Sequence, residues 1–281
     1  MKITWYSTEP APDHPVPGGL AWLRVARRGF GMVLVLLLLL PALLAARGID
    51  AARHGRRPLA PRIVQAFGAG CLRVIGLPLT VKGRADGAAG AVVSNHTGWL
   101  DILVLAAALP VTFVSKDAVA GWPVIGALAR WAGTLFIARD RRQAPQQAAR
   151  LAERLRAGSR MLFFPEGTST DGRRVLRFHA PLFGGLLAAA GDMPFRVQPV
   201  SVVLHGPEGA DPRFYAWWGD AELAPHLLAV LARRRHGRVT VVLHPSVETS
   251  PGEDRKALAG RLETIVRAGV AAELGLPPAD R

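Results

Sequence analysis

The chain has 281 residues, 50% of them hydrophobic, and a formal net charge of +14. Its length allows one large domain or one domain with an extension, and its single cysteine, Cys71, excludes an internal disulfide and fits a reducing compartment. The positive charge favours anionic partners such as a lipid surface, whereas the arginines lack the interleaved aromatic residues of a single-strand binder, so we expect no nucleic-acid partner.

The first 79 residues predict a tail followed by a membrane anchor. Residues 1–28 form a basic, proline-containing tail, and we expect its first 19 residues to be loosely ordered. Residues 29–79 contain one apolar run at 30–46 and a second apolar stretch at 63–77. The pair predicts a membrane-embedded helical hairpin, or a spanning helix with an interfacial helix. Two buried core helices are the alternative, which suits the second stretch better than the first.

The charges around the first apolar run leave its topology open. Arginines flank it on both sides, so the positive-inside rule selects no orientation. Basic residues at both ends suit a segment that enters and leaves the same cytosolic leaflet. A cleaved signal peptide is another interpretation, because a basic region precedes the run and small residues follow it. That interpretation predicts a secreted hydrolase that lacks the residues before about 47.

From about residue 80 the sequence alternates between short β-rich runs and helical runs. Such alternation predicts an α/β fold over residues 80–281, with a mostly parallel central sheet covered by helices. The expected strands cover residues 91–94, 111–115, 134–138, 161–164, 197–204 and 239–244, and the expected helices cover residues 102–109, 122–131, 144–157, 181–190, 221–234 and 254–274.

Polar groups follow three of the predicted strands. His96 follows the first, Arg139 the third, and the turn 165–168 the fourth. Because parallel strands end at one edge of a sheet, we expect these groups to meet in one cleft. Arg139 would bind a phosphate through its guanidinium fork. In the turn, Gly167 would let the backbone approach a ligand, and Glu166 would hold Arg139 or backbone amides in place.

His96 and Asp101 are the candidate catalytic pair. If a helix begins near Thr97, Asp101 lies in its first turn, where the helix dipole favours a carboxylate, and it can fold back onto His96. An aspartate that accepts from Nδ1–H leaves Nε2 as the base. Ser94 lies on the other side of the strand and has no nucleophile elbow, which favours a dyad over a triad. A capped helix in which His96 has no chemical role is the alternative.

These motifs resemble those of the glycerolipid acyltransferases, the family that contains 1-acyl-sn-glycerol-3-phosphate acyltransferase. Asn95, His96 and Asp101 look like its N-H-x4-D motif, and residues 136–139, 164–168 and 198–200 are similar to its second, third and fourth blocks. The blocks occur in family order over roughly residues 80–245. In the family, a basic residue often follows the Gly-Thr of the third block. This chain has Ser169 there, with Arg173, Arg174 and Arg177 close behind to replace the charge.

The resemblance implies an O-acyltransferase in which the His96–Asp101 dyad activates a lysolipid hydroxyl for attack on the thioester of acyl-CoA or acyl carrier protein. The expected acceptor is 1-acyl-sn-glycerol-3-phosphate, giving phosphatidic acid. Lyso-ornithine lipid or another lysophospholipid is the alternative acceptor, and a non-catalytic lipid-transfer protein of the same fold is the competing class.

The resemblance also implies a setting and further site residues. No metal or other cofactor is called for, and the enzyme would sit on anionic lipid at the inner membrane with its active site facing the cytoplasm. The substrate-binding residues that it implies are Arg139, Glu166, Gly167, Thr168 and Pro199.

Overall fold

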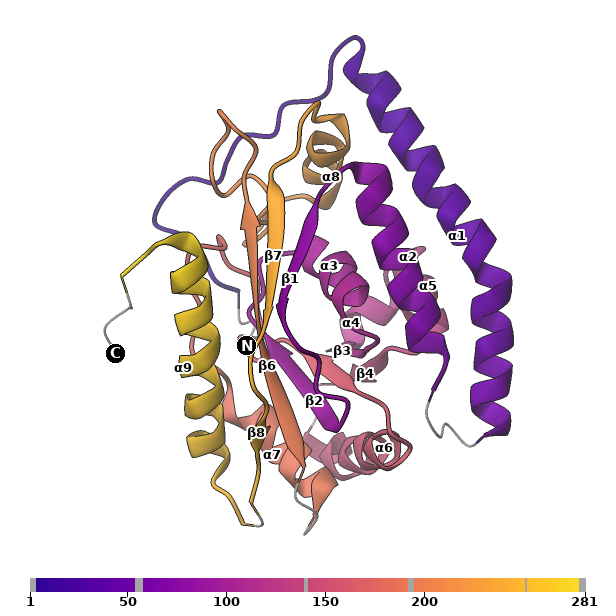
Figure 1. Ribbon diagram of the computed structural model, residues 1–281, viewed down its shortest axis with the longest axis vertical. Coiled ribbons are helices and arrows are strands. Elements are labelled where there is room, and N and C mark those ends of the chain that lie inside the picture. The colour runs from indigo at the N-terminus through magenta and orange to yellow at the C-terminus, as the bar shows by residue number, and fades with distance from the viewer. Residues whose placement is uncertain (1–3, 54–57, 139–140, 192–194, 251, 278–281) are drawn as a thin grey trace.

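The fold is built on one sheet with helices on both faces (Figure 1). The computed structural model describes residues 4–53, 58–138, 141–191, 195–250 and 252–277. Within these residues an eight-stranded sheet has the order β1-β7-β6-β2-β5-β3-β4, and β8 pairs with β6. The strands are β1 (Leu79–Gly83), β2 (Ala89–Ser94), β3 (Thr112–Lys116), β4 (Leu135–Ile137), β5 (Met161–Phe163), β6 (Arg196–His205), β7 (Arg238–Leu243) and β8 (Val247–Glu248).

Most strand pairs in this sheet are parallel. β2 runs parallel to β5 and β6, β3 runs parallel to β4 and β5, and β1 runs parallel to β7, whereas β6 is antiparallel to β7 and β8. The prediction of an α/β fold with a mostly parallel sheet is therefore confirmed. Strand β1 is not among the strands predicted from the sequence. It is an edge strand of five residues that exposes four of them and has only two apolar side chains, Leu79 and Val81.

The helices form a layer on each face of the sheet. Side chains of α2, α3 and α8 pack on one face, and those of α6, α7 and α9 pack on the other. The helices are α1 (Ala21–Ala52), α2 (Ala60–Ile75), α3 (Leu100–Ala108), α4 (Asp117–Ala120), α5 (Ile125–Trp131), α6 (Ala144–Arg156), α7 (Ala180–Ala190), α8 (Leu223–Ala232) and α9 (Arg255–Leu274), with a 3-10 turn η1 at Arg141–Gln143.

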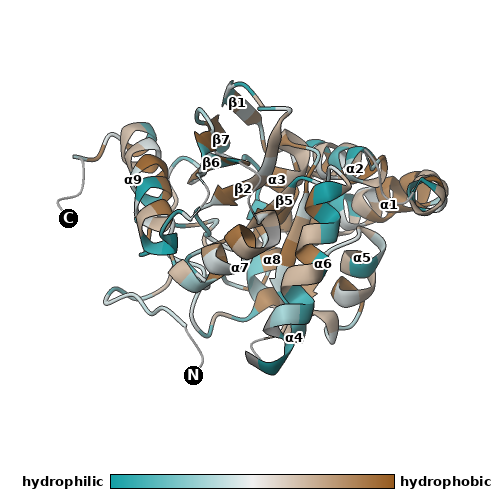
Figure 2. Cartoon of the chain, turned by 90° about the horizontal axis from the view of Figure 1, so that it is seen from below, coloured by the Kyte–Doolittle hydropathy of each residue, from teal (hydrophilic) through white to brown (hydrophobic). Residues whose placement is uncertain are grey.

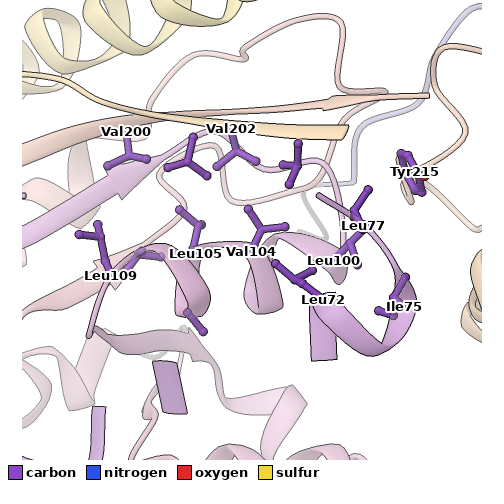
Figure 3. Close-up of a cluster of buried hydrophobic side chains, with 14 of the residues drawn as sticks. Leu72, Ile75, Leu77, Leu100, Val104, Leu105, Leu109, Val200, Val202 and Tyr215 are labelled. Carbon is purple, nitrogen blue, oxygen red and sulfur yellow. The ribbon is translucent and has the colours of Figure 1, made fainter. Parts of the chain in front are cut away.

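Helix α3, which carries Asp101, is fixed in the middle of the core. Figure 3 shows Val104 and Leu105 of α3 lying against the sheet below Val200 and Val202 of β6, and all four side chains are fully buried. On its other side α3 meets α2, where Gly68 makes a close approach possible: a Cβ at Gly68 would lie 2.7 Å from the Leu103 carbonyl oxygen. The candidate base and its partner therefore stand on a rigid support.

Helix α1 lies outside the two layers and is largely uncovered. It begins at Ala21, inside the predicted tail, and runs without interruption through Pro41. Its most apolar stretch is only 11% buried by the rest of the chain, and Figure 2 shows hydrophobic colour along it at the rim of the molecule. A 32-residue helix is about 48 Å long, more than the hydrocarbon thickness of a bilayer. Its length, composition and exposure fit association with a membrane.

Arginines near the start of α1 fasten this helix to the end of α8. The Arg28 guanidinium is buried and donates to the carbonyl oxygens of Leu231 and Arg233, at 2.8 and 2.6 Å, and Arg24 donates to that of Ala232 at 2.6 Å. Carbonyls in the last turn of a helix have no partner inside the helix, and cations there also oppose its dipole. The first turns of α1 thus serve as a C-terminal cap for α8.

Candidate active site

The ends of β2 and β5 bring two of the sequence motifs together. The two strands are parallel neighbours with Val93 opposite Phe163, so the chain leaves both strands at the same edge of the sheet. His96 lies two residues beyond the end of β2, and the turn 165–168 begins two residues beyond the end of β5. This edge is the candidate active site.

His96 and Asp101 form a hydrogen-bonded pair at this edge. His96 Nδ1 lies 2.8 Å from Oδ2 of Asp101, which is fully buried in the first turn of α3. The carboxylate also accepts the amide hydrogens of Thr97 at 2.5 Å and Gly98 at 3.0 Å, and the Thr97 hydroxyl at 2.6 Å. Four donors fix the carboxylate, and an acceptor at Nδ1 fixes the tautomer in which Nδ1 carries the proton.

The other side of the His96 ring is open. The ring stacks on Phe164 with centroids 4.0 Å apart and an interplanar angle of 17°, and its side chain is 22% exposed. Among the residues that the structure describes, none is hydrogen-bonded to Nε2. A neutral imidazole with Nδ1–H bound to a carboxylate and an accessible Nε2 lone pair can act as a general base.

Glu166 is buried behind His96 and holds two backbone amides. Its Oε1 accepts the amide hydrogen of His96 and its Oε2 that of Leu176, both at 2.7 Å. Burial raises the pKa of Glu166 to about 8, against the lowering effect of the two amide donors. The sequence predicts either Arg139 or backbone amides as partners of this glutamate. Its contacts are to the amides, and Arg139 lies outside the described residues.

Among the described residues, some backbone amides of the turn after β5 have an acceptor and others have none. Gly167 has a positive φ of 71°, which glycine adopts without strain. Its own amide donates to the Phe164 carbonyl, and the Gly98 amide is bound to Asp101. The amide hydrogens of Thr168 and Ser169 have no acceptor within the described part of the chain.

Pro199 is a residue of the sheet itself. It is buried within β6 and pairs with Val93 of β2, one position before the end of that strand. It therefore lies inside the sheet, whereas His96 and the turn 165–168 lie beyond its edge.

Three contacts that the sequence does not predict complete the site. Lys116, the last residue of β3, donates to the Gly167 carbonyl at 2.5 Å. The amides of Thr170 and Trp217 donate to the carbonyls of His96 and Thr97, at 2.9 and 2.7 Å. The only local signal for Lys116 is a basic residue at the end of a predicted strand. For Thr170 and Trp217 there is none, because backbone hydrogen bonds leave no mark on residue type.

A buried carboxylate that orients an accessible histidine is an arrangement capable of general acid–base chemistry. The comparisons with known proteins give the class. A family model described as Acyltransferase matches residues 80–203, which contain the dyad and the turn 165–168. The lyso-ornithine lipid O-acyltransferase of Rhodobacter capsulatus is 47% identical over 267 residues, covering 95% of this chain and 96% of that protein.

More distant relatives extend the same likeness. The 1-acyl-sn-glycerol-3-phosphate acyltransferase of Neisseria gonorrhoeae is 30% identical over 231 residues, covering 80% of this chain and 86% of that protein. The fold is similar to the crystal structure of the 1-acyl-sn-glycerophosphate acyltransferase PlsC from Thermotoga maritima, with a TM-score of 0.59, 21% identity, and coverage of 92% of this chain and 98% of that one.

The chain belongs to the acyltransferase family that includes these lyso-ornithine lipid and 1-acyl-sn-glycerol-3-phosphate acyltransferases. It is an O-acyltransferase that acts on lysolipids.

Proposed function

We propose that the chain transfers a fatty acyl group from acyl-CoA or acyl carrier protein to the free hydroxyl of lyso-ornithine lipid. The observation that favours this acceptor is the 47% identity to a lyso-ornithine lipid O-acyltransferase over nearly the whole chain. The acceptor that the motifs alone favour, 1-acyl-sn-glycerol-3-phosphate, is the second candidate and is supported by the 30% identical relatives.

In the proposed mechanism, Nε2 of His96 takes the proton of the acceptor hydroxyl as its oxygen attacks the thioester carbonyl. Asp101 stabilises the imidazolium through the 2.8 Å contact at Nδ1. A C–O bond forms, the C–S bond breaks, and the imidazolium proton neutralises the departing thiolate. Because a thiolate leaves readily, with a free thiol pKa of about 8.5, no second acid is needed.

The turn after β5 supports this chemistry. We propose that the amides of Thr168 and Ser169 bind the oxyanion of the tetrahedral intermediate. Glu166 acts on the reaction through the His96 amide, so it is a positioning residue. Substrate contacts of Arg139, Gly167 and Pro199 stay predictions from the resemblance.

The proposed setting is the inner membrane, with the active site facing the cytoplasm. Residues 29–79 would anchor the chain through α1, residues 80–281 would form the catalytic domain, and the basic surface would lie on anionic lipid. Each arginine near such a leaflet contributes about 1 kcal/mol. Cytosolic thioesters and a membrane-resident acceptor require this side of the bilayer.

The test is an acceptor panel with the purified full-length chain. Lyso-ornithine lipid, 1-acyl-sn-glycerol-3-phosphate, lysophosphatidylethanolamine and glycerol 3-phosphate are each given with acyl-CoA and with acyl carrier protein, and products are identified by mass. We expect diacylated ornithine lipid at the highest kcat/KM. A higher kcat/KM for 1-acyl-sn-glycerol-3-phosphate would reverse the order of the two candidates, and product from glycerol 3-phosphate alone would refute both.

A further inference from the structure

Residues 4–20 have no regular secondary structure, yet they are fastened to the turn after β5 at the candidate active site. Figure 1 shows this segment running along the end of the sheet toward which β6 points. The Trp5 amide donates to Thr168 Oγ1 at 3.3 Å, and the Tyr6 hydroxyl donates to Asp220 at 3.1 Å. Glu9 pairs with Arg213 at 3.0 Å. We call residues 4–17 the N-terminal strap.

The strap holds one arginine of the loop that follows the Gly-Thr turn. The Arg174 guanidinium carbon lies 5.2 Å from the centre of the Trp5 ring, a cation–π contact. Its Nε and Nη2 atoms face the two carboxylate oxygens of Asp171 at 3.2 and 2.9 Å. The guanidinium is thus fixed on one face and along one edge.

Arg174 is also tied to the dyad through its backbone. The Thr170 hydroxyl lies 3.3 Å from both the Arg174 and the His96 carbonyls, and the Thr170 amide donates to His96 at 2.9 Å. A short loop therefore joins the arginine to the base, and both lie at the same edge of the sheet.

One edge of the Arg174 guanidinium remains for a ligand. Its side chain is 49% exposed, and Nη1 has no hydrogen-bond partner among the described residues. Arg213, the other arginine held by the strap, is only 13% exposed and already pairs with both Glu9 and Asp211. Arg174 is therefore the better placed of the two to accept an anion.

We propose that Arg174, held by Asp171 and by Trp5 of the N-terminal strap, binds the anionic group of the lysolipid head. The ligand chemistry is a carboxylate, as in an ornithine head, or a phosphate. An arginine fixed before binding loses little conformational entropy when the head group arrives. This site would supply the charge that Ser169 does not, and the inference rests on the proposed function because it names the head-group contact of the same acceptor.

The test measures acceptor affinity without turnover. The full-length chain in detergent is titrated, with no acyl donor, with lyso-ornithine lipid for the carboxylate arm and with lysophosphatidic acid for the phosphate arm. For Arg174→Gln we expect Kd to rise about tenfold or more for the anion that the site takes, which is the effect of losing a charge-assisted hydrogen bond. For Trp5→Ala we expect a rise of about threefold, since the arginine loses only its ring contact.

Two controls separate head-group binding from net charge and from misfolding. Arg177 is exposed in the same loop, but among the described residues neither Trp5 nor Asp171 holds it as they hold Arg174. Arg177→Gln therefore removes the same charge and should leave both Kd values unchanged. Monoacylglycerol has the acceptor hydroxyl but no anion, so its Kd should be the same for the wild type and Arg174→Gln. The proposal would be overturned if Arg177→Gln raised Kd as much as Arg174→Gln does, or if Arg174→Gln raised the Kd for monoacylglycerol by the same factor.

The outcomes of this test differ from those of the acceptor panel. If diacyl product forms and Arg174→Gln binds both anionic acceptors like the wild type, only the head-group site is refuted. If Arg174→Gln weakens binding but neither acceptor is acylated, the proposed acceptors are refuted and the anion site stands. A wild type that binds neither anionic lipid refutes both.

Discussion

His96 and His244 each make a side-chain hydrogen bond of 2.8 Å, yet the surroundings of the two rings differ. His96 Nδ1 meets the buried Asp101, and the rest of the ring faces the open edge of the sheet. His244 Nε2 meets the Ser201 hydroxyl, which is fully buried and donates its proton to the Val266 carbonyl of α9.

The difference lies in the direction of each hydrogen bond and in access. Because the Ser201 hydroxyl donates its hydrogen to the Val266 carbonyl, it can only accept a hydrogen bond from His244 Nε2. His244 therefore cannot act as the base that activates Ser201 as a nucleophile. Burial also lowers the pKa of His244. A serine beside a histidine therefore indicates packing here, whereas a histidine between a carboxylate and solvent indicates chemistry.

The strongest test of this comparison is to remove each ring in turn. His96→Ala should lower kcat about 10²–10⁴-fold at unchanged thermal stability, because the general base is lost. His244→Ala should lower thermal stability and keep kcat in the folded fraction within about threefold. Thiol release with acyl-CoA and the chosen acceptor measures kcat, and thermal unfolding in the same detergent measures stability. A folded His96→Ala chain with unchanged thiol release would remove the dyad from the mechanism.

The pH dependence of stability should show an effect smaller than the loss of kcat in His96→Ala. Its source is the buried Glu166, which holds the His96 amide. The pKa of Glu166 rises from 4.5 to about 8 on folding, so between these values the folded chain binds one more proton than the unfolded chain. This contribution to the free energy of unfolding is complete below pH 4.5 and is lost as the pH rises to about 8, by at most about 1.4 kcal/mol per pH unit.

Glu166→Gln is the matched variant for this measurement, since glutamine does not titrate. Denaturant unfolding at pH 5, 6, 7 and 8 should show the wild type losing stability relative to Glu166→Gln as the pH rises. Parallel curves for the two proteins would mean that Glu166 keeps an ordinary pKa in the fold.

The smallest change in stability is expected at the Ser201–His244 pair. Ser201→Ala removes the hydroxyl and leaves His244 Nε2 and the Val266 carbonyl without this partner, so the free energy of unfolding should fall by about 1–3 kcal/mol. Denaturant unfolding measures the loss, and kcat should not change. A drop in kcat that exceeds the loss of folded protein would show that Ser201 contributes to catalysis.

The local parts of the site could be predicted from the sequence, and the distant contacts could not. His96 and Asp101 are five residues apart, so a strand end followed by a helix start is enough to place them together. Strands β6 and β7 are β-branched and buried, which makes their pattern clear. The bond from Trp5 to Thr168 joins residues 163 positions apart, and no periodicity encodes such a contact. A tail rich in proline predicts the absence of helix there but not its docking.

The arginine cap between α1 and α8 has a consequence for how the enzyme meets its acceptor. With Arg24 and Arg28 bonded to the last carbonyls of α8, the first turns of α1 are fastened to a helix that packs on the central sheet. If α1 lies in lipid, the height and tilt of the cleft above the leaflet are set by this joint. The search for an acceptor then becomes lateral diffusion in two dimensions, with each passing head group meeting the cleft at the same depth.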